Sequence, residues 1–131
     1  MLARFRVATS SPTQIVEITS DINKIIAQSG IDSGICTIFC PHSTAGVAIT
    51  ENSDGEMLMN MIQSFERVFP TSGMTVVNNK ASSYLKTMLT GNSVNVIISD
   101  GNLLLGNWQG IFLFEHGGPK NRSVFVKIIE D

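Results

Sequence analysis

One short polar turn brings together residue types that could bind an anion or move a proton. His42, Ser43 and Thr44 lie between Pro41 and Ala45-Gly46, so an imidazole and two hydroxyls share the turn with several backbone N–H groups. Small residues let backbone N–H groups approach a phosphate or carboxylate, and hydroxyls donate hydrogen bonds to it. A histidine can act as a general acid or base near neutral pH. We therefore predict that His42 is catalytic and that Ser43 and Thr44 bind a small anionic ligand.

Two glycine-rich segments near the end of the sequence contain further candidate ligand-binding residues. Residues 106–110 read Gly-Asn-Trp-Gln-Gly, and Trp108 is the single tryptophan of the chain. Residues 117–122 read Gly-Gly-Pro-Lys-Asn-Arg, which places Lys120 and Arg122 in a stiff loop. Guanidinium and ammonium groups form charge-assisted hydrogen bonds to oxyanions. We predict that Lys120 and Arg122 bind a phosphorylated ligand, with Trp108 and Gln109 as further ligand-binding residues.

A group of carboxylates follows the histidine turn. Glu51, Asp54 and Glu56 could organise Mg²⁺ or supply a general base. Asp54 and Glu56 also stand at the start of a predicted helix, where negative charge is favourable, so their presence needs no catalytic explanation. Glu51 is separated from the histidine turn by one short strand, and we retain it as the second candidate catalytic residue.

Each of these segments also has a purely structural interpretation. His42 could hydrogen-bond a neighbouring carbonyl while Ser43 and Thr44 close the turn. The loop with Lys120 and Arg122 could be a hairpin whose charges are solvated, with the tryptophan packed at the edge of a sheet. Residue types alone leave both interpretations open.

Common enzyme signatures are absent from the sequence. There is no Walker loop, no GxSxG or HExxH motif and no dinucleotide fingerprint. With two histidines, His42 and His116, one chain alone cannot form a three-histidine zinc site. No metal ligand is assigned, and the identity of any cofactor stays open.

Hydrophobic periodicity predicts the elements that must position these residues. Alternation predicts strands over 3–7, 15–18, 35–40, 47–50, 94–98, 103–105, 111–114 and 123–129, the last four as an antiparallel meander. Helical spacing predicts a helix that Ser20 caps and Gly30 ends, a second behind the capping segment 53–56 that stops before Pro70, and a third over 81–89. Residues 74–77 could form one more strand. The sequence therefore predicts an α+β fold, a single domain of residues 1–131 with mostly antiparallel sheet and about three helices packed on it.

Length and charge limit the classes of partner. The 131 residues suit one domain, and nine Lys plus Arg against eleven Asp plus Glu give a net charge of −2 without basic runs, which argues against nucleic-acid binding. No apolar stretch is long enough to cross a membrane, and no secretory signal is recognisable, so we expect a cytoplasmic protein. Cys36 and Cys40 lie about 13 Å apart on one strand, too far to pair, and we expect both to be buried thiols.

Taken together, the motifs resemble those of the YjbQ-like family. The resemblance rests on Pro-His-Ser-Thr-Ala-Gly at 41–46, on Gly-Asn-Trp-Gln-Gly at 106–110, and on Glu115 followed by the segment 118–122. It spans nearly the whole chain. It implies a small domain, largely β with flanking helices, that assembles as a homotrimer, and an association with secondary thiamine-phosphate synthase activity, which joins a pyrimidine pyrophosphate to a thiazole phosphate. In the family, histidines line a pocket that binds metal or anions, and His42 matches one of them.

The sequence departs from the family pattern at the other pocket histidines. Tyr84 stands where the family has a histidine in its GN…AHLK segment, and residues 74–79 contain no counterpart of another. Two hypotheses follow. In the first, the protein is a synthase of this type, in which His42, Ser43 and Thr44 grip the departing pyrophosphate while Lys120 and Arg122 neutralise it. In the second, it is a non-catalytic relative that keeps the trimer and binds a small anionic ligand or acts as a scaffold.

Overall fold

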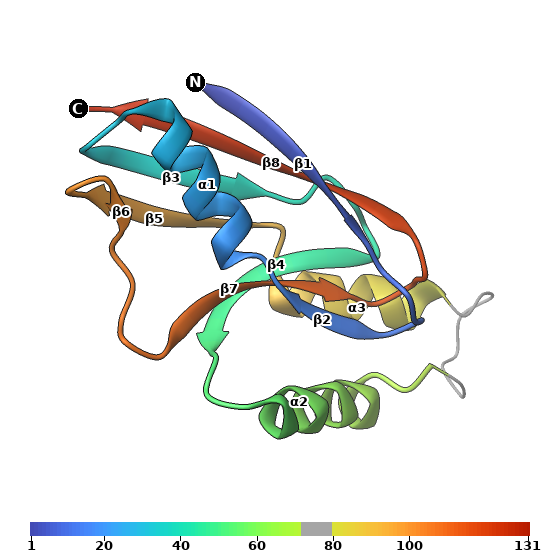
Figure 1. Ribbon diagram of the computed structural model, residues 1–131. Coiled ribbons are helices and arrows are strands. Elements are labelled where there is room, and N and C mark those ends of the chain that lie inside the picture. Colours follow the sequence, from blue (N-terminus) through green and yellow to red (C-terminus); the bar gives the residue numbers. More distant parts are fainter. Residues whose placement is uncertain (72–79) are drawn as a thin grey trace.

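The computed structural model describes residues 1–71 and 80–131, and this part of the chain contains eight strands and three helices in two sheets (Figure 1). The strand expected over 74–77 lies outside the described residues. The elements are, in chain order, β1 (Leu2–Ala8), β2 (Gln14–Glu17), α1 (Thr19–Ser29), β3 (Gly34–Phe39), β4 (Ala45–Glu51), α2 (Gly55–Val68), α3 (Lys80–Thr90), β5 (Ser93–Ser99), β6 (Asn102–Leu103), β7 (Gln109–Glu115) and β8 (Asn121–Glu130).

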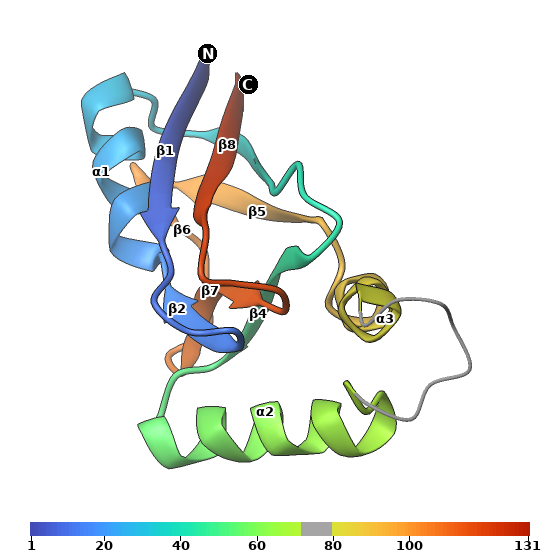
Figure 2. The ribbon, with the colours of Figure 1, turned by 90° about the vertical axis from the view of Figure 1, so that its right-hand side faces the viewer.

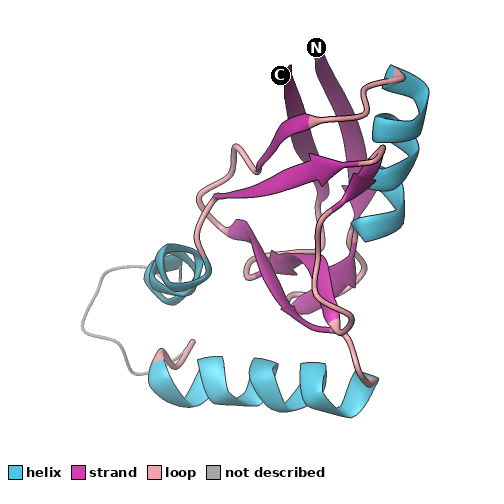
Figure 3. Ribbon diagram, turned by 90° about the vertical axis from the view of Figure 1, so that its left-hand side faces the viewer, coloured by secondary structure: helices cyan, strands magenta, loops and turns pink. Residues whose placement is uncertain are grey.

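All strand pairs are antiparallel. The larger sheet, called sheet A, has the order β1-β8-β3-β5-β6, and the smaller, sheet B, has the order β2-β7-β4. Helix α1 covers the inner side of sheet A, and α2 lies on the side of sheet B that faces away from sheet A (Figures 2 and 3). The predicted α+β class with a mostly antiparallel, single-domain architecture is confirmed. None of the described helices is both long and apolar enough to span a bilayer.

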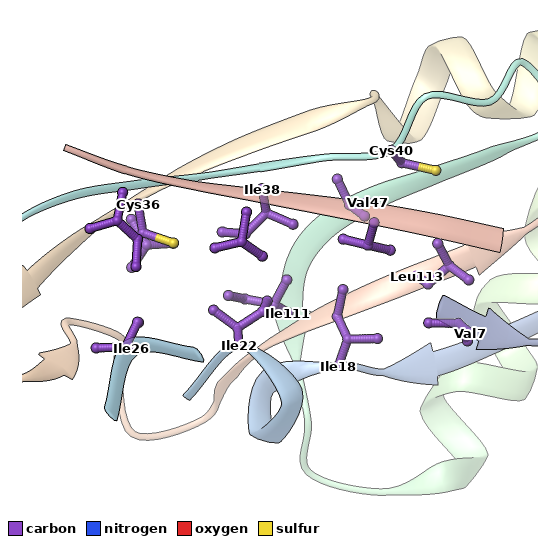
Figure 4. Packing of buried hydrophobic residues seen from close by; sticks show 14 of the residues in the cluster. Val7, Ile18, Ile22, Ile26, Cys36, Ile38, Cys40, Val47, Ile111 and Leu113 are labelled. Carbon is purple, nitrogen blue, oxygen red and sulfur yellow. The ribbon is translucent and has the colours of Figure 1, made fainter. Parts of the chain in front are cut away.

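The core fills the space between α1 and the inner faces of the two sheets (Figure 4). Its members come from every layer, and the fully buried ones include Ile22, Ile38, Val47 and Ile111. Cys36 and Cys40 are free thiols inside this core, as predicted, and burial raises the pKa of each to about 11. Such thiols stay protonated and unreactive at neutral pH.

The predicted C-terminal meander is wrong. β5 and β6 form a hairpin, but β7 belongs to sheet B, and β8 inserts between β1 and β3 of sheet A. The reason lies in the run 110–115, which is buried at every position. A strand with two buried faces needs cover on both sides, and β7 obtains it from the core on one side and from α2 on the other.

Two helix details also differ from the prediction. Helix α1 begins at Thr19 without a side-chain cap, so Ser20 is not the N-cap; the Thr19 hydroxyl instead accepts a hydrogen bond from the Ile111 N–H at 2.9 Å. Helix α2 begins within the predicted capping segment, where the Asp54 carboxylate accepts the Met57 N–H at 2.8 Å, and it ends before Pro70 as expected.

Helix α3 turns its apolar stripe outward. Tyr84, Met88 and Leu89 are exposed, whereas the buried side chains are those of Ser82, Lys86 and Thr87. The hydrophobic periodicity predicts the helix correctly but would place its opposite face inside. A helix whose polar side is buried must satisfy that side with hydrogen bonds or ion pairs.

Candidate functional site

Two chain crossings between the sheets create the site. Residues 40–44 lead from β3 in sheet A to β4 in sheet B, and residues 116–120 lead from β7 in sheet B back to β8 in sheet A. Because Ala45 pairs with Glu115 in the β4–β7 ladder, both crossings lie at the same end of sheet B (Figure 1). The histidine turn and the hairpin that carries Lys120 therefore lie at the same end of sheet B.

A buried ion pair joins the two crossings. Glu115 and Arg122 are 1% and 3% exposed. The Arg122 Nε–H donates to Glu115 Oε1 at 2.8 Å, and the NH2 group contacts Oε2. The carboxylate also accepts the Thr9 hydroxyl at 2.7 Å and the Gly117 N–H at 3.1 Å. Burial alone would raise the pKa of Glu115, but the hydrogen bonds from Arg122, Thr9 and Gly117 hold that pKa below its usual range.

The guanidinium continues into the histidine turn. The Arg122 NH2 group donates to Thr44 Oγ1 at 2.7 Å and to the Thr44 carbonyl at 3.2 Å, which buries Thr44. The Asn92 amide donates to the carbonyls of Cys40 and His42 at 3.1 and 2.8 Å and fixes the other side of the turn. Arg122 and Thr44 therefore hold the turn in shape.

Gly46 allows the turn to enter β4. A Cβ atom at Gly46 would lie 2.2 Å from the Gly91 carbonyl oxygen, which accepts the Val47 N–H at 3.0 Å. The glycine of the Pro-His-Ser-Thr-Ala-Gly motif is therefore required by a close backbone approach between β4 and the end of α3.

His42 is held as a neutral imidazole with one defined tautomer. The Ser123 N–H donates to its Nε2 at 3.0 Å, so Nδ1 carries the proton. Burial, with the positive charge of Arg122 and a smaller effect of Lys120, lowers the pKa of His42 below its usual range. At neutral pH the ring can therefore donate a hydrogen bond through Nδ1–H without carrying charge.

An open groove of about 430 Å³ lies at this imidazole. Its lining comes from the turn, from the end of β3 and from the Asn92 side chain, and it includes Phe39, Cys40, Pro41, His42, Ser43 and Asn92. The Ser43 side chain is exposed, and so is that of Lys120 on the adjoining hairpin. The groove thus offers an imidazole N–H, a hydroxyl and a nearby ammonium to an anion.

Three predicted site residues lie elsewhere in the chain's fold. Glu51 pairs with Gln109 at the far end of the β4–β7 ladder, whereas Ala45 and Glu115 pair at the histidine end. Six strand residues separate the two ends, which corresponds to about 20 Å. Trp108, 64% exposed, precedes Gln109 in the loop before β7. Within one chain, therefore, Glu51, Trp108 and Gln109 do not join His42, Ser43, Thr44, Lys120 and Arg122.

Sequence reasoning missed two groups at the site. Thr9 follows β1 and bonds to Glu115, 106 residues away in the chain, and Asn92 precedes β5 and bonds to His42, 50 residues away. No local sequence pattern marks either residue. His116 is buried beside the site, with its ring centroid 5.8 Å from that of Phe65 and its Nε2 3.3 Å from the Thr90 hydroxyl. Burial, together with the charge of Lys86, lowers the pKa of His116 to about 4.

The donor set does not fit the metal that the family resemblance implies. Among residues 1–71 and 80–131, no group of three or more His, Cys, Asp or Glu side chains is arranged to hold a metal ion. The described site offers hydrogen-bond donors and positive charge, which suit an anion.

Comparison with known proteins identifies the family of the chain. The family model described as UPF0047 protein YjbQ-like matches residues 3–131. The chain belongs to the YjbQ-like UPF0047 family. It is 37% identical to the UPF0047 protein MJ1081 of Methanocaldococcus jannaschii over 100% of this chain and 96% of that protein. It is 32% identical to the UPF0047 protein YugU of Bacillus subtilis over 98% and 99% of the two chains.

Solved YjbQ-like structures share the fold. A YjbQ/UPF0047 family protein from Clostridium acetobutylicum superposes with a TM-score of 0.93 at 38% identity, covering 97% of this chain and 99% of that one. A YbjQ-like protein from Sulfolobus solfataricus gives a TM-score of 0.94 at 27% identity, covering 100% and 97%. The two-sheet arrangement that brings both crossings together is therefore the family's architecture.

Proposed function

We propose that the protein binds a phosphorylated ligand in the groove at His42 and acts as a thiamine-phosphate-synthase-like transferase. The observation that carries the proposal is that the neutral imidazole of His42 and Ser43 line one groove, while the Lys120 ammonium is close enough to lower the pKa of His42. Anion sites in proteins commonly combine such donors with a nearby positive charge.

In this reaction the bond between the pyrimidine's carbon and the pyrophosphate oxygen breaks, and that oxygen keeps the electron pair. The ring nitrogen of the thiazole phosphate forms the new bond to the carbon. His42 Nδ1–H and the Ser43 hydroxyl donate to the departing oxygens, and Lys120 offsets their growing negative charge. Arg122, engaged with Glu115 and Thr44, positions the turn. Catalysis would rest on electrostatic stabilisation of the leaving group.

Homotrimer formation is part of the proposal. The outer face of sheet A exposes a row of apolar side chains, which cross-strand pairing places together: Leu2, Ile35, Phe39, Ile97 and Ile129. Exposed apolar patches of this kind mark interfaces between proteins. Glu51, Trp108 and Gln109 would reach a His42 groove only when a second copy supplies them. We keep a cytoplasmic location as a prediction, which cell fractionation checks.

The test is formation of thiamine phosphate from the pyrimidine pyrophosphate and the thiazole phosphate by the purified protein, measured by chromatography. Replacing His42 with Ala should lower the rate about 100-fold, the range for loss of one hydrogen-bond donor to developing negative charge. Replacing the exposed Ser64 of α2 with Ala is the matched control and should leave the rate unchanged. Absence of thiamine phosphate with the wild-type protein would exclude the synthase activity, and a His42→Ala rate equal to that of the wild type would exclude the role of His42.

A non-catalytic role is the second candidate, because Tyr84 replaces a family histidine and the described residues lack a three-ligand group. Calorimetric titration with inorganic pyrophosphate separates the two candidates. Binding that His42→Ala weakens, without any turnover of the two substrates, would favour the non-catalytic role. Absence of pyrophosphate binding would contradict both.

A further inference from the structure

Helix α2 covers the outer side of sheet B without packing closely against it. The helix is amphipathic and turns Leu58, Ile62 and Phe65 toward the sheet, yet none of its residues is buried. Figure 2 shows the first part of α2 lying beneath sheet B and its later part extending toward α3. An apolar helix face normally loses its exposure by close packing, so this face retains room for another apolar group.

Hollows follow the inner side of α2 from one end to the other. A groove of about 330 Å³ lies at the start of the helix, and one of about 480 Å³ lies near its end. Between them is a small cavity of about 10 Å³. All three share Thr13 and Ile62 as lining residues, so they lie next to one another between α2 and the segment around β2, and we call this row of hollows the channel.

A buried cation stands at the inner wall of this channel. Lys86 of α3 lines the central cavity, and its side chain is 3% exposed. Its ammonium donates to Glu66 Oε2 at 2.6 Å, and the Glu66 side chain, on α2, is 45% exposed. The ammonium of Lys86 is therefore fixed in the interior, whereas the carboxylate of Glu66 is partly in contact with solvent.

The surroundings leave Lys86 as the charge that a ligand would meet. Glu115 also lines the cavity, but it is paired with Arg122. His116 lines it too, and with a pKa of about 4 it is neutral at pH 7. The remaining wall is mostly apolar, from Ile15, Ile62, Phe65 and Phe114, with the uncharged polar residues Thr13 and Gln14. A mostly apolar pocket with a few convergent polar groups is typical of small-molecule sites.

We propose that this channel binds a small amphipathic monocarboxylate, whose alkyl tail lies along α2 and whose carboxylate replaces Glu66 as the partner of Lys86. A buried ammonium must keep an anionic partner, so the exchange of one carboxylate for another preserves its pairing. The displaced Glu66 regains water, because nearly half of its side chain is already exposed. The grooves, of several hundred Å³, fall in the size range of small-molecule pockets.

Calorimetric titration with decanoate, below its micelle concentration, tests the proposal on the full chain. We expect one decanoate per chain, and binding at least ten-fold tighter than that of decanol, which has the same tail without charge. This comparison uses the unaltered protein. Equal affinity for the two probes, or absence of decanoate binding, would overturn the proposal.

Variants locate the site. Lys86→Met keeps the volume of the side chain and should weaken decanoate binding at least ten-fold, whereas Glu66→Gln removes the competing carboxylate and should tighten it. Lys24→Met removes an exposed cation of α1, outside the lining of the channel, and is the matched control, with unchanged binding expected; circular dichroism verifies the fold of each variant. Equal losses in Lys86→Met and Lys24→Met would contradict the proposal. Occupation of the channel by a second copy of the chain would also contradict the proposal. An Ile62→Glu variant with a lower particle mass than the wild type in light scattering would reveal it.

Discussion

Replacing Arg122 with Met tests whether the buried ion pair holds the site together. The variant leaves the Glu115 carboxylate buried with hydrogen bonds from the Thr9 hydroxyl and the Gly117 N–H. Breaking one side of a buried pair costs about 3–5 kcal/mol, because the other charge stays in the interior. With a urea slope of about 2 kcal/mol per molar, the unfolding midpoint should fall by about 2 M.

The dependence of this loss on pH is diagnostic. In the wild type the pKa of Glu115 is held below its usual range, so its contribution to stability is present above that range and disappears as the pH falls. Without the guanidinium, burial prevails and raises the pKa of Glu115. As the pH falls, Glu115 of the variant therefore becomes protonated at a higher pH than Glu115 of the wild type. Between those two pH values, the difference in unfolding free energy between variant and wild type shrinks by about 1.4 kcal/mol per pH unit.

Urea unfolding at pH 7.5 and pH 5, followed by circular dichroism at one fixed protein concentration, measures both effects. The double variant Arg122→Met with Glu115→Gln removes both charges and should recover most of the lost stability. A double variant as unstable as Arg122→Met, or a loss that is identical at both pH values, would refute the reasoning.

Three further predictions address other parts of the structure. Gly46→Ala forces a Cβ against the Gly91 carbonyl and should lower the melting temperature by about 10 °C, whereas Gly55→Ala, with open space around it, should not. The pKa of His116 is lowered to about 4, so the native state should lose about 3 kcal/mol as the pH falls from 6.5 to 4, and His116→Phe should flatten that decline in urea titrations. Ile35→Lys on the outer face of sheet A should dissociate the proposed homotrimer, as measured by light scattering, while Gln28→Lys at an exposed position of α1 should not.

Local patterns in the sequence predict most elements but not their partners. Alternation marks β1, and helical spacing with an acidic cap marks α2, because both signals depend on neighbours a few residues away. The position of β8 between β1 and β3 depends on pairings across the whole chain, so no local signal specifies it. The continuous apolar run of β7 is the one local feature that argues against an exposed meander.

The candidate site is predictable in part for the same reason. His42, Thr44 and Arg122 are recognisable from their motifs, and in the structure Arg122 donates to Thr44 while the Ser123 N–H donates to His42. Glu51 is separated from the histidine turn by one strand in the sequence. Because that strand is extended, Glu51 and the histidine turn lie at opposite ends of β4 in the structure. Helix α3 shows the opposite case, since its buried Lys86 is stabilised by Glu66 of another helix, which hydrophobic periodicity does not register.

The strand order of sheet A has a consequence for synthesis. β8 follows every other strand of sheet A in the chain, yet it is the strand with which β1 and β3 both pair, and it supplies Arg122 and Ser123 to the histidine turn. A nascent chain that still lacks residues 121–130 holds β1 without its ladder and Glu115 without its counter-charge. Sheet A and the groove therefore form together, after residues 121–130 have left the exit tunnel.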